Sequence, residues 1–174
     1  MKTAPLFVLS FFLCIVAQAE HHAKHLFILS GQSNMQGHRP EEAFTPTVEK
    51  ALGKDKVIVV QDALGGQPIH RWWKQWKTPE GKKPAQSGDL YERLMSKVNP
   101  AIKGKKLASV SFVWMQGERD AKEQLSEVYA DSFKGIITQL QKDLKKDKIN
   151  FVVGRISDFD MQNKKYKHWT KIRE

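Results

Sequence analysis

The sequence predicts an α/β fold, a three-layer sandwich in which helices cover both faces of a central parallel sheet. Four apolar runs rich in β-branched residues lie at 25–30, 56–61, 107–115 and 150–154. Each run is continuous rather than alternating, which is typical of strands that are buried on both faces. Helical patterns lie between the runs, and strands that alternate with helices indicate a parallel sheet.

Three segments between these runs have helical patterns. The first, at 45–52, has a proline near its start and a glycine directly after its end. The second covers 89–95, and Ser87 is placed to cap it. The strongest pattern runs from about 120 to 145, with apolar side chains at three- and four-residue spacing and lysines on the opposite face. We interpret this stripe as core packing and Asp120 as the N-cap of one long helix. The polar stretch 74–88 is expected to be a surface loop.

Residues 1–19 are expected to be a signal peptide. Lys2 precedes an apolar run that is too short to span a bilayer comfortably, and Ala17-Gln18-Ala19 has the small residues that signal peptidase accepts. A retained membrane anchor is the less favoured alternative, because polar residues follow at once. Residues 20–174 would then form one domain without cysteine and without stable membrane insertion, which suits a secreted or periplasmic protein.

Composition excludes some classes of partner. The formal net charge is +10, but the lysines are scattered over loops and polar helix faces rather than gathered in one stripe with aromatic residues. We therefore expect a solvated basic surface with no nucleic-acid partner. Cleavage after Ala19 would also place His22 third from a free amine, a nitrogen set favoured by Cu(II) or Ni(II). A polar tail is the favoured interpretation of that segment, and no metal is assigned to the site.

Three polar segments that contain glycine each follow a predicted strand, at 31–35, 65–67 and 116–120. Because ligands bind at the carboxyl ends of parallel strands, these segments should meet at one edge of the sheet. A Gly-x-Ser turn after a strand can present Ser33 as a nucleophile. The backbone N–H groups of Ser33 and Gly66 could then stabilise an oxyanion.

Two side chains of the third segment add to this chemistry. The amide of Gln116 is a candidate third donor to the oxyanion. Glu118 either orients a histidine or serves as an acid at the start of a helix. Three tryptophans near the second segment, Trp72, Trp73 and Trp76, are candidates for sugar stacking or for packing.

Together, Gly31-Gln32-Ser33-Asn34-Met35, Gly65-Gly66-Gln67-Pro68-Ile69 and Trp114-Met115-Gln116-Gly117-Glu118-Arg119-Asp120-Ala121 resemble the sialate O-acetylesterase / carbohydrate esterase family 6 branch of the SGNH hydrolases. The resemblance implies removal of acetyl groups from sugar hydroxyls through an acyl-enzyme, without a cofactor. It implies that Ser33 is the nucleophile and that Glu118 assists the catalytic histidine. Gly66 and Gln116, together with Gln32 and Asn34, would bind the oxyanion or the substrate, an acetylated carbohydrate of the xylan or sialic-acid type.

The chain departs from the family pattern in one respect. The family carries its catalytic histidine near the C-terminus in an Asp-x-x-His block, whereas His38, His70 and His168 each lack an aspartate three residues earlier. His38 remains a candidate for the pocket, and His70 for its rim or for packing. We expect a C-terminally incomplete SGNH-type domain that lacks its last strand and helix. The alternatives are a non-catalytic carbohydrate-binding relative and, less favoured, an unrelated basic α/β binding protein.

Overall fold

The structure, a computed structural model, describes residues 23–174. The expected signal peptide and the segment Glu20-His21-His22 lie outside these residues, so both stay predictions. Within 23–174, no helix combines the length and the apolar character that crossing a bilayer requires.

The centre of the molecule is a sheet of four parallel strands: β1 (Lys24–Gly31), β2 (Val57–Ala63), β3 (Leu107–Met115) and β4 (Asn150–Val153). The predicted parallel sheet is therefore confirmed, and each predicted strand is present. The strand order is β2-β1-β3-β4, so it changes direction between β1 and β3. An α/β sheet binds ligands beyond the carboxyl ends of its strands at such a point.

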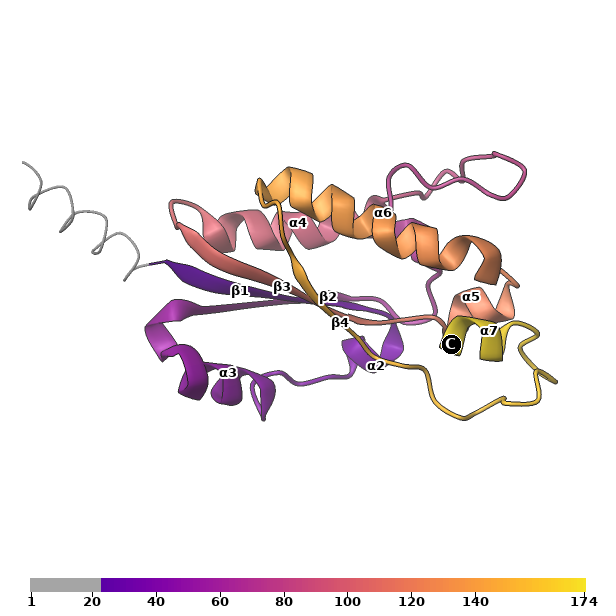
Figure 1. The fold of residues 1–174 in the computed structure, drawn as a ribbon, viewed down its shortest axis with the longest axis horizontal. Coiled ribbons are helices and arrows are strands. Elements are labelled where there is room, and N and C mark those ends of the chain that lie inside the picture. The colour runs from indigo at the N-terminus through magenta and orange to yellow at the C-terminus, as the bar shows by residue number, and fades with distance from the viewer. Residues whose placement is uncertain (1–22) are drawn as a thin grey trace, which may run out of the picture.

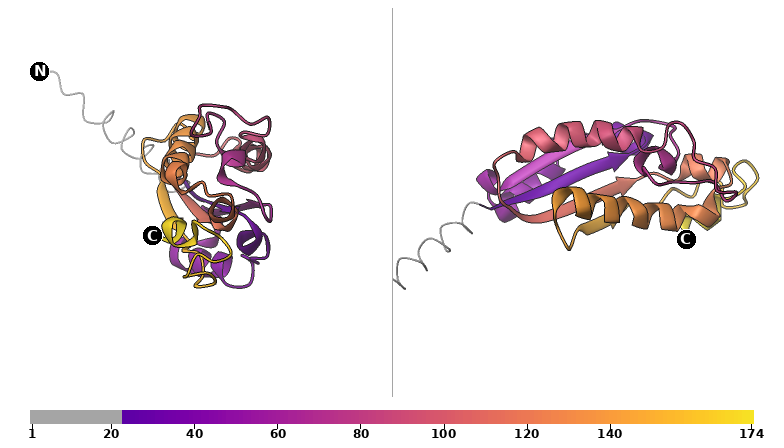
Figure 2. Two further views of the ribbon diagram at one scale, coloured as in Figure 1. Left: turned by 90° about the vertical axis from the view of Figure 1, so that its right-hand side faces the viewer. Right: turned by 90° about the horizontal axis from the view of Figure 1, so that it is seen from above.

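Helices cover both faces of this sheet, as the three-layer sandwich requires (Figures 1 and 2). The helices α4 (Asp89–Ile102) and α6 (Ser126–Leu144) lie on one face, and α3 (Phe44–Leu52) lies on the other. The main core lies between the sheet and the first pair of helices. Its fully buried members include Leu26, Ile28, Tyr91, Leu94, Phe112, Trp114, Ile136 and Leu140.

Short helices lie near the carboxyl end of the sheet. They are α2 (Ser33–Gln36), η2 (Ile69–Trp72), α5 (Glu118–Lys122) and α7 (Trp169–Arg173), and a further short helix, η1 (Lys54–Lys56), precedes β2.

The single long helix expected over 120–145 is instead two helices, α5 and α6. Gln124 lies between them with φ of 61°, a left-handed conformation that an α-helix cannot contain. The N-cap prediction for Asp120 is also wrong. This residue lies inside α5, where its side chain is buried and bonded to another segment.

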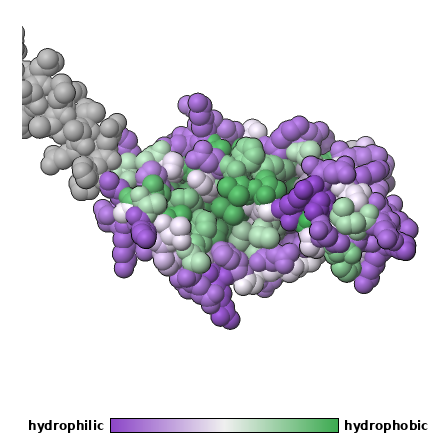
Figure 3. All heavy atoms as spheres, turned by 60° about the horizontal axis from the view of Figure 1, so that its bottom comes forward, coloured by the Kyte–Doolittle hydropathy of each residue, from purple (hydrophilic) through white to green (hydrophobic). Residues whose placement is uncertain are grey.

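Burial of the strands on both faces does not extend to β4. Phe151, Val152 and Val153 are 58%, 60% and 47% exposed. Figure 3 shows apolar side chains gathered on the face of the molecule opposite α4 and α6. This edge strand therefore leaves apolar surface uncovered by the described residues.

Candidate active site

A tight turn at the end of β1 presents Ser33. Gly31 has φ of +140°, and a Cβ added there would lie 2.0 Å from the carbonyl oxygen of Met115. Only glycine fits this approach between β1 and β3. Gln32 then donates its backbone N–H to Met115 (2.9 Å), and α2 begins at Ser33. The strand, the turn and the helix thus leave Ser33 exposed beyond the end of the sheet.

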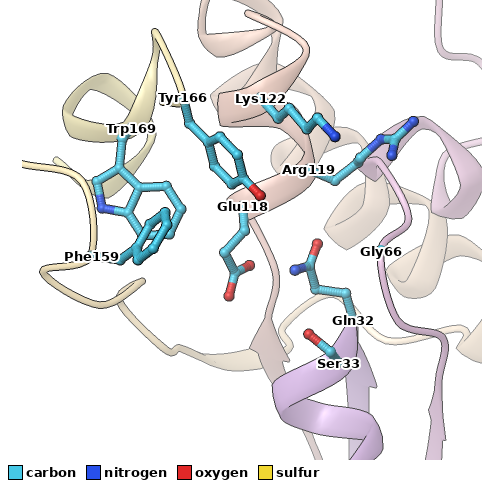
Figure 4. Close-up of a pocket in the computed structure, with 9 residues that line it drawn as sticks. All are labelled: Gln32, Ser33, Gly66, Glu118, Arg119, Lys122, Phe159, Tyr166 and Trp169. Carbon is cyan, nitrogen blue, oxygen red and sulfur yellow. The ribbon is translucent and has the colours of Figure 1, made fainter. Parts of the chain in front are cut away.

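Ser33 opens onto a cavity of about 320 Å³ (Figure 4). Of the six predicted site residues, Gln32, Ser33, Gly66 and Glu118 line this cavity, and they come from the ends of three neighbouring strands. Five further residues complete the wall: Arg119, Lys122, Phe159, Tyr166 and Trp169. The predicted segments therefore share one edge of the sheet.

Gly66 presents its backbone to this cavity. Its φ is +68°, and an added Cβ would meet no atom within 4 Å. The loop is fixed by the preceding residue, because Gly65 donates its N–H to Oε1 of Gln36 (2.7 Å). Among the described residues, no acceptor bonds to the N–H of Gly66. This N–H is therefore open to a ligand at the cavity.

Two buried oxygens at the cavity also lack a partner. Asn34 donates from Nδ2 to Oε1 of Glu118 (2.8 Å), which leaves the second carboxylate oxygen, Oε2, without a bond to any described residue. The Oε1 atom of Gln32 is also buried and has no hydrogen bond to any described residue. A buried polar atom without a partner costs about 1–3 kcal/mol. Both oxygens are therefore suited to accept a hydrogen bond from a ligand.

The surroundings of Glu118 also alter its acidity. Burial raises the pKa of its carboxyl, although the hydrogen bonds that the carboxyl accepts oppose this shift. Figure 4 shows the carboxylate directed into the same space as the Ser33 hydroxyl. A carboxyl with a raised pKa at this position is suited to exchange or stabilise a proton.

Gln116 occupies a different position from the one expected. Its side chain is buried and does not line the cavity. Its Nε2 donates to the carbonyl oxygen of Gln67 (3.0 Å) and to the carboxylate of Asp120. Both amide hydrogens are engaged inside the protein, so the expectation that Gln116 donates to an oxyanion is not met in this arrangement. Its contacts instead hold the segment 65–67 against the segment 116–120.

None of the four described histidines lines the cavity. His70 packs on Trp76 with ring centroids 5.1 Å apart, and burial lowers its pKa. Nδ1 of His168 lies 2.8 Å from Oγ of Ser126. His38 does not line the cavity, contrary to the expectation that it was a pocket candidate. Within residues 23–174, no cluster of His, Cys, Asp and Glu is arranged to hold a metal ion.

Sequence reasoning missed the aromatic wall of the cavity, which consists of Phe159, Tyr166 and Trp169. It considered the tryptophans of the second segment, but Trp72 and Trp76 are buried in the interior. The rings that line the cavity are those of Phe159, Tyr166 and Trp169, which follow β4. The rule that ligands bind at the carboxyl ends of strands, applied to the fourth strand as well, would have indicated this segment.

Comparison with known proteins agrees with this architecture. A family model described as "Carbohydrate esterase, sialic acid-specific acetylesterase" matches residues 38–174. No curated protein matches the chain. Among solved structures, the X-ray structure of a protein from Arabidopsis thaliana is similar, with a TM-score of 0.64 and 21% sequence identity over 87% of this chain and 80% of that chain. At this identity the similarity concerns the fold.

Proposed function

Since the chain belongs to the carbohydrate esterase family of sialic acid-specific acetylesterases, we propose that it is a serine esterase that removes O-acetyl groups from carbohydrate. One observation supports this most strongly. The Ser33 hydroxyl, the open N–H of Gly66 and the carboxyl of Glu118 line a single cavity at the point where the strand order changes direction. The expected signal peptide would place the reaction outside the cytoplasm.

In the proposed reaction, Oγ of Ser33 attacks the carbonyl carbon of the acetyl ester. The bond between that carbon and the sugar oxygen breaks, the sugar leaves as an alcohol after taking up a proton, and the acetyl group stays on Ser33. Water then attacks the acetyl-serine and releases acetate. The N–H of Gly66 and the N–H groups that begin α2 face the developing oxyanion, and one such donor is typically worth 10²–10³ in rate.

Glu118 is proposed to support the group that removes the proton from Ser33. Its Oε1 is fixed by Asn34, while its Oε2 has no partner among the described residues and can accept from the N–H of an imidazole. This carboxyl would hold an imidazole in one tautomer and stabilise its cationic form. The family resemblance assigns that imidazole to an Asp-x-x-His block.

A second candidate function is a protein that binds acetylated carbohydrate without hydrolysing it. The observation that favours it is that none of the described histidines lines the cavity with Ser33. Without an adjacent base, a serine hydroxyl is a weak nucleophile. Binding without turnover would identify this second function.

Steady-state hydrolysis of a simple acetate ester tests the esterase, in a protein that also carries the Asp-x-x-His block expected from the family resemblance. Ser33→Ala should lower kcat by about 10⁴-fold, because only the oxyanion donors and binding remain. Glu118→Gln should lower it less, since it removes charge but keeps a hydrogen-bonding side chain. Ser96→Ala, an exposed serine on α4, is the matched control and should leave kcat unchanged. Equal turnover in Ser33→Ala and the unmodified protein would exclude serine catalysis.

A further inference from the structure

The sequence predicts a dispersed basic surface, but the fold gathers many of the lysines at one end of the molecule. All strands of a parallel sheet begin at the same edge, which here is the edge opposite the cavity. The segments that lead into β2, β3 and β4 are 53–56, 103–106 and 145–148. Together with Lys24, which begins β1, they form what we call the basic end, with nine lysines and two aspartates. In Figure 1 the start of β1 lies on the left, away from α5 and α7.

Direct contacts hold the parts of the basic end side by side. The backbone N–H of Lys24 donates to the carbonyl oxygen of Lys106 (2.8 Å), and its Nζ donates to the carbonyl oxygen of Asp55. Nζ of Lys146 donates to the carbonyl oxygen of Leu107 (2.5 Å), where β3 begins. Each of the three segments therefore adjoins the start of β1 or of β3, the two central strands of the sheet.

The charge of the basic end is not neutralised by the described residues. None of its nine lysines forms an ion pair with a described carboxylate. Its formal charge is +7, compared with +10 for the whole chain. Six of the lysines are exposed, namely Lys54, Lys103, Lys105, Lys106, Lys145 and Lys148. Like charges at this density repel one another, and a partner that supplies negative charge would relieve the repulsion.

The side chains present at the basic end indicate the kind of partner. The three segments consist only of lysine, aspartate and glycine, and they contain no aromatic, arginine or amide side chain. A site for one small anion or sugar needs groups that fix the orientation of the ligand, as the planar fork of arginine does. Lysine instead is a mobile point charge. Clusters of several lysines are suited to a surface that presents many anionic headgroups.

We propose that the basic end binds the surface of an anionic phospholipid membrane without inserting into it. The described chain starts at this end with Ala23, so the expected signal peptide would join the protein on the side that faces the lipid. The strand β3 has nine residues and therefore spans about 30 Å. Binding in this orientation would hold the cavity about 30 Å from the membrane surface and open to the solvent. It does not depend on esterase activity.

Sedimentation with lipid vesicles tests this proposal. The chain from Glu20 is used, because the apolar leader would itself enter lipid and because the whole described core lies after this residue. The anionic vesicles contain phosphatidylglycerol and phosphatidylcholine in equal parts, and vesicles of phosphatidylcholine alone are the neutral reference. At low salt the chain should bind the anionic vesicles at least about tenfold more tightly. High salt should abolish the difference, because salt screens the charges.

Two variants of equal net charge separate the basic end from the charge of the whole chain. The first replaces the three lysines of one segment: Lys103→Gln, Lys105→Gln and Lys106→Gln. The matched control replaces three exposed lysines of the loop 74–88: Lys77→Gln, Lys82→Gln and Lys83→Gln. A lysine close to an anionic surface contributes about fivefold in affinity, so the first variant should bind about a hundredfold more weakly. The control should bind nearly as well as the unmodified chain.

A third variant tests whether the segments form one surface. It replaces lysines of the two other segments: Lys54→Gln, Lys56→Gln and Lys148→Gln. A loss of about a hundredfold is again expected, since the contacts at the starts of β1 and β3 place these segments beside the first. The third variant also guards against a loss that arises from a local change at 103–106 alone.

The proposal is overturned if the unmodified chain does not bind the anionic vesicles, or binds neutral vesicles equally well. Equal binding by the control and by the two variants of the basic end would also overturn it, as would binding that high salt leaves unchanged. Beads that carry polygalacturonate are compared with the anionic vesicles at the same salt. Tighter binding to the beads would identify an acidic polysaccharide, in place of lipid, as the partner of the basic end.

Discussion

Asp120 connects two of the segments that build the cavity. Its buried carboxyl accepts the backbone N–H of Ile69 at 3.0 Å and the side-chain amide of Gln116. Ile69 follows the loop that contains Gly66, so this one carboxyl fixes the loop against the end of β3. Burial raises the pKa of Asp120 from an ordinary 3.8 to about 7. At the residue scale, the arrangement of the candidate oxyanion loop is thus linked to a titrating group.

This link makes stability depend on pH. Between about pH 4 and pH 7 the folded protein keeps the proton of Asp120 while the unfolded chain releases it, so the contribution of this group to the free energy of unfolding falls as pH rises and levels off above pH 7. Asp120→Asn should lose that slope, because asparagine does not titrate yet keeps an acceptor for the N–H of Ile69. Urea unfolding at several pH values gives the free energy of unfolding of both proteins. The difference between the two curves isolates Asp120, because the other carboxyls are common to both proteins. Parallel curves over this range would contradict the assignment.

At the element scale, η2 and α6 approach each other through Trp73 and Gly135. A Cβ added at Gly135 would lie 2.2–2.6 Å from three atoms of the Trp73 ring, so the ring occupies the space that a side chain would need. Trp73 directly follows η2, which in turn follows the Gly66 loop. The contact therefore fixes the distance between this loop and the helix that covers the sheet.

Gly135→Ala should destabilise the protein although alanine favours helices. The substitution gains about 0.5–1 kcal/mol of helix propensity, but forcing the ring to move typically costs about 1–3 kcal/mol. We expect a net loss of about 1 kcal/mol in the free energy of unfolding, measured by urea denaturation. In a Trp73→Leu background, where the smaller side chain makes room for the methyl group, Gly135→Ala should no longer be destabilising. A stabilised single variant would show that Trp73 does not limit this position.

The sequence predicted the elements more completely than the site. Continuous apolar runs identify strands in a covered sheet, and all four were found near their expected bounds. The break at Gln124 carries no such signal, because glutamine is not a residue that commonly adopts a left-handed conformation. The aromatic wall was missed for another reason. Phe159 lies in an irregular segment and Trp169 begins a helix of only five residues, so neither has a periodic pattern around it, and only tertiary packing brings them to Ser33.

At the scale of the whole molecule, a basic surface coexists with an exposed apolar edge. The formal net charge of +10 opposes association of one copy with another. The β4 strand favours it, because its apolar side chains are exposed and no strand among residues 23–174 pairs with its outer edge. Which tendency dominates should depend on salt, since salt screens charge repulsion and leaves the apolar attraction in place.

Self-association should therefore increase with ionic strength and decrease in Val152→Lys. Val152 is 60% exposed, so a lysine there interrupts the apolar edge without disturbing the core. Thr47→Lys, at an exposed position of α3, adds the same charge elsewhere and serves as the control. Sedimentation velocity at low and high salt measures the effect. Equal sedimentation of the two lysine variants would show that β4 is not the surface of association.

The aromatic wall belongs to a hydrophobic cluster of its own. Trp169 packs with Ala121 and Ile156 apart from the main core of the sheet. Segments joined to a protein by a small cluster open at lower free energy than the core does, so the region from Ile156 to Arg173 should behave as a separate cooperative unit. The backbone N–H groups of Lys164, Lys165 and Tyr166 donate to the carboxylate of Asp160. In hydrogen exchange, these amides should lose protection together and well before those of β1 and β3. A ligand bound in the cavity that these rings line would then slow that exchange, so occupancy of the cavity could be followed without any chemical turnover.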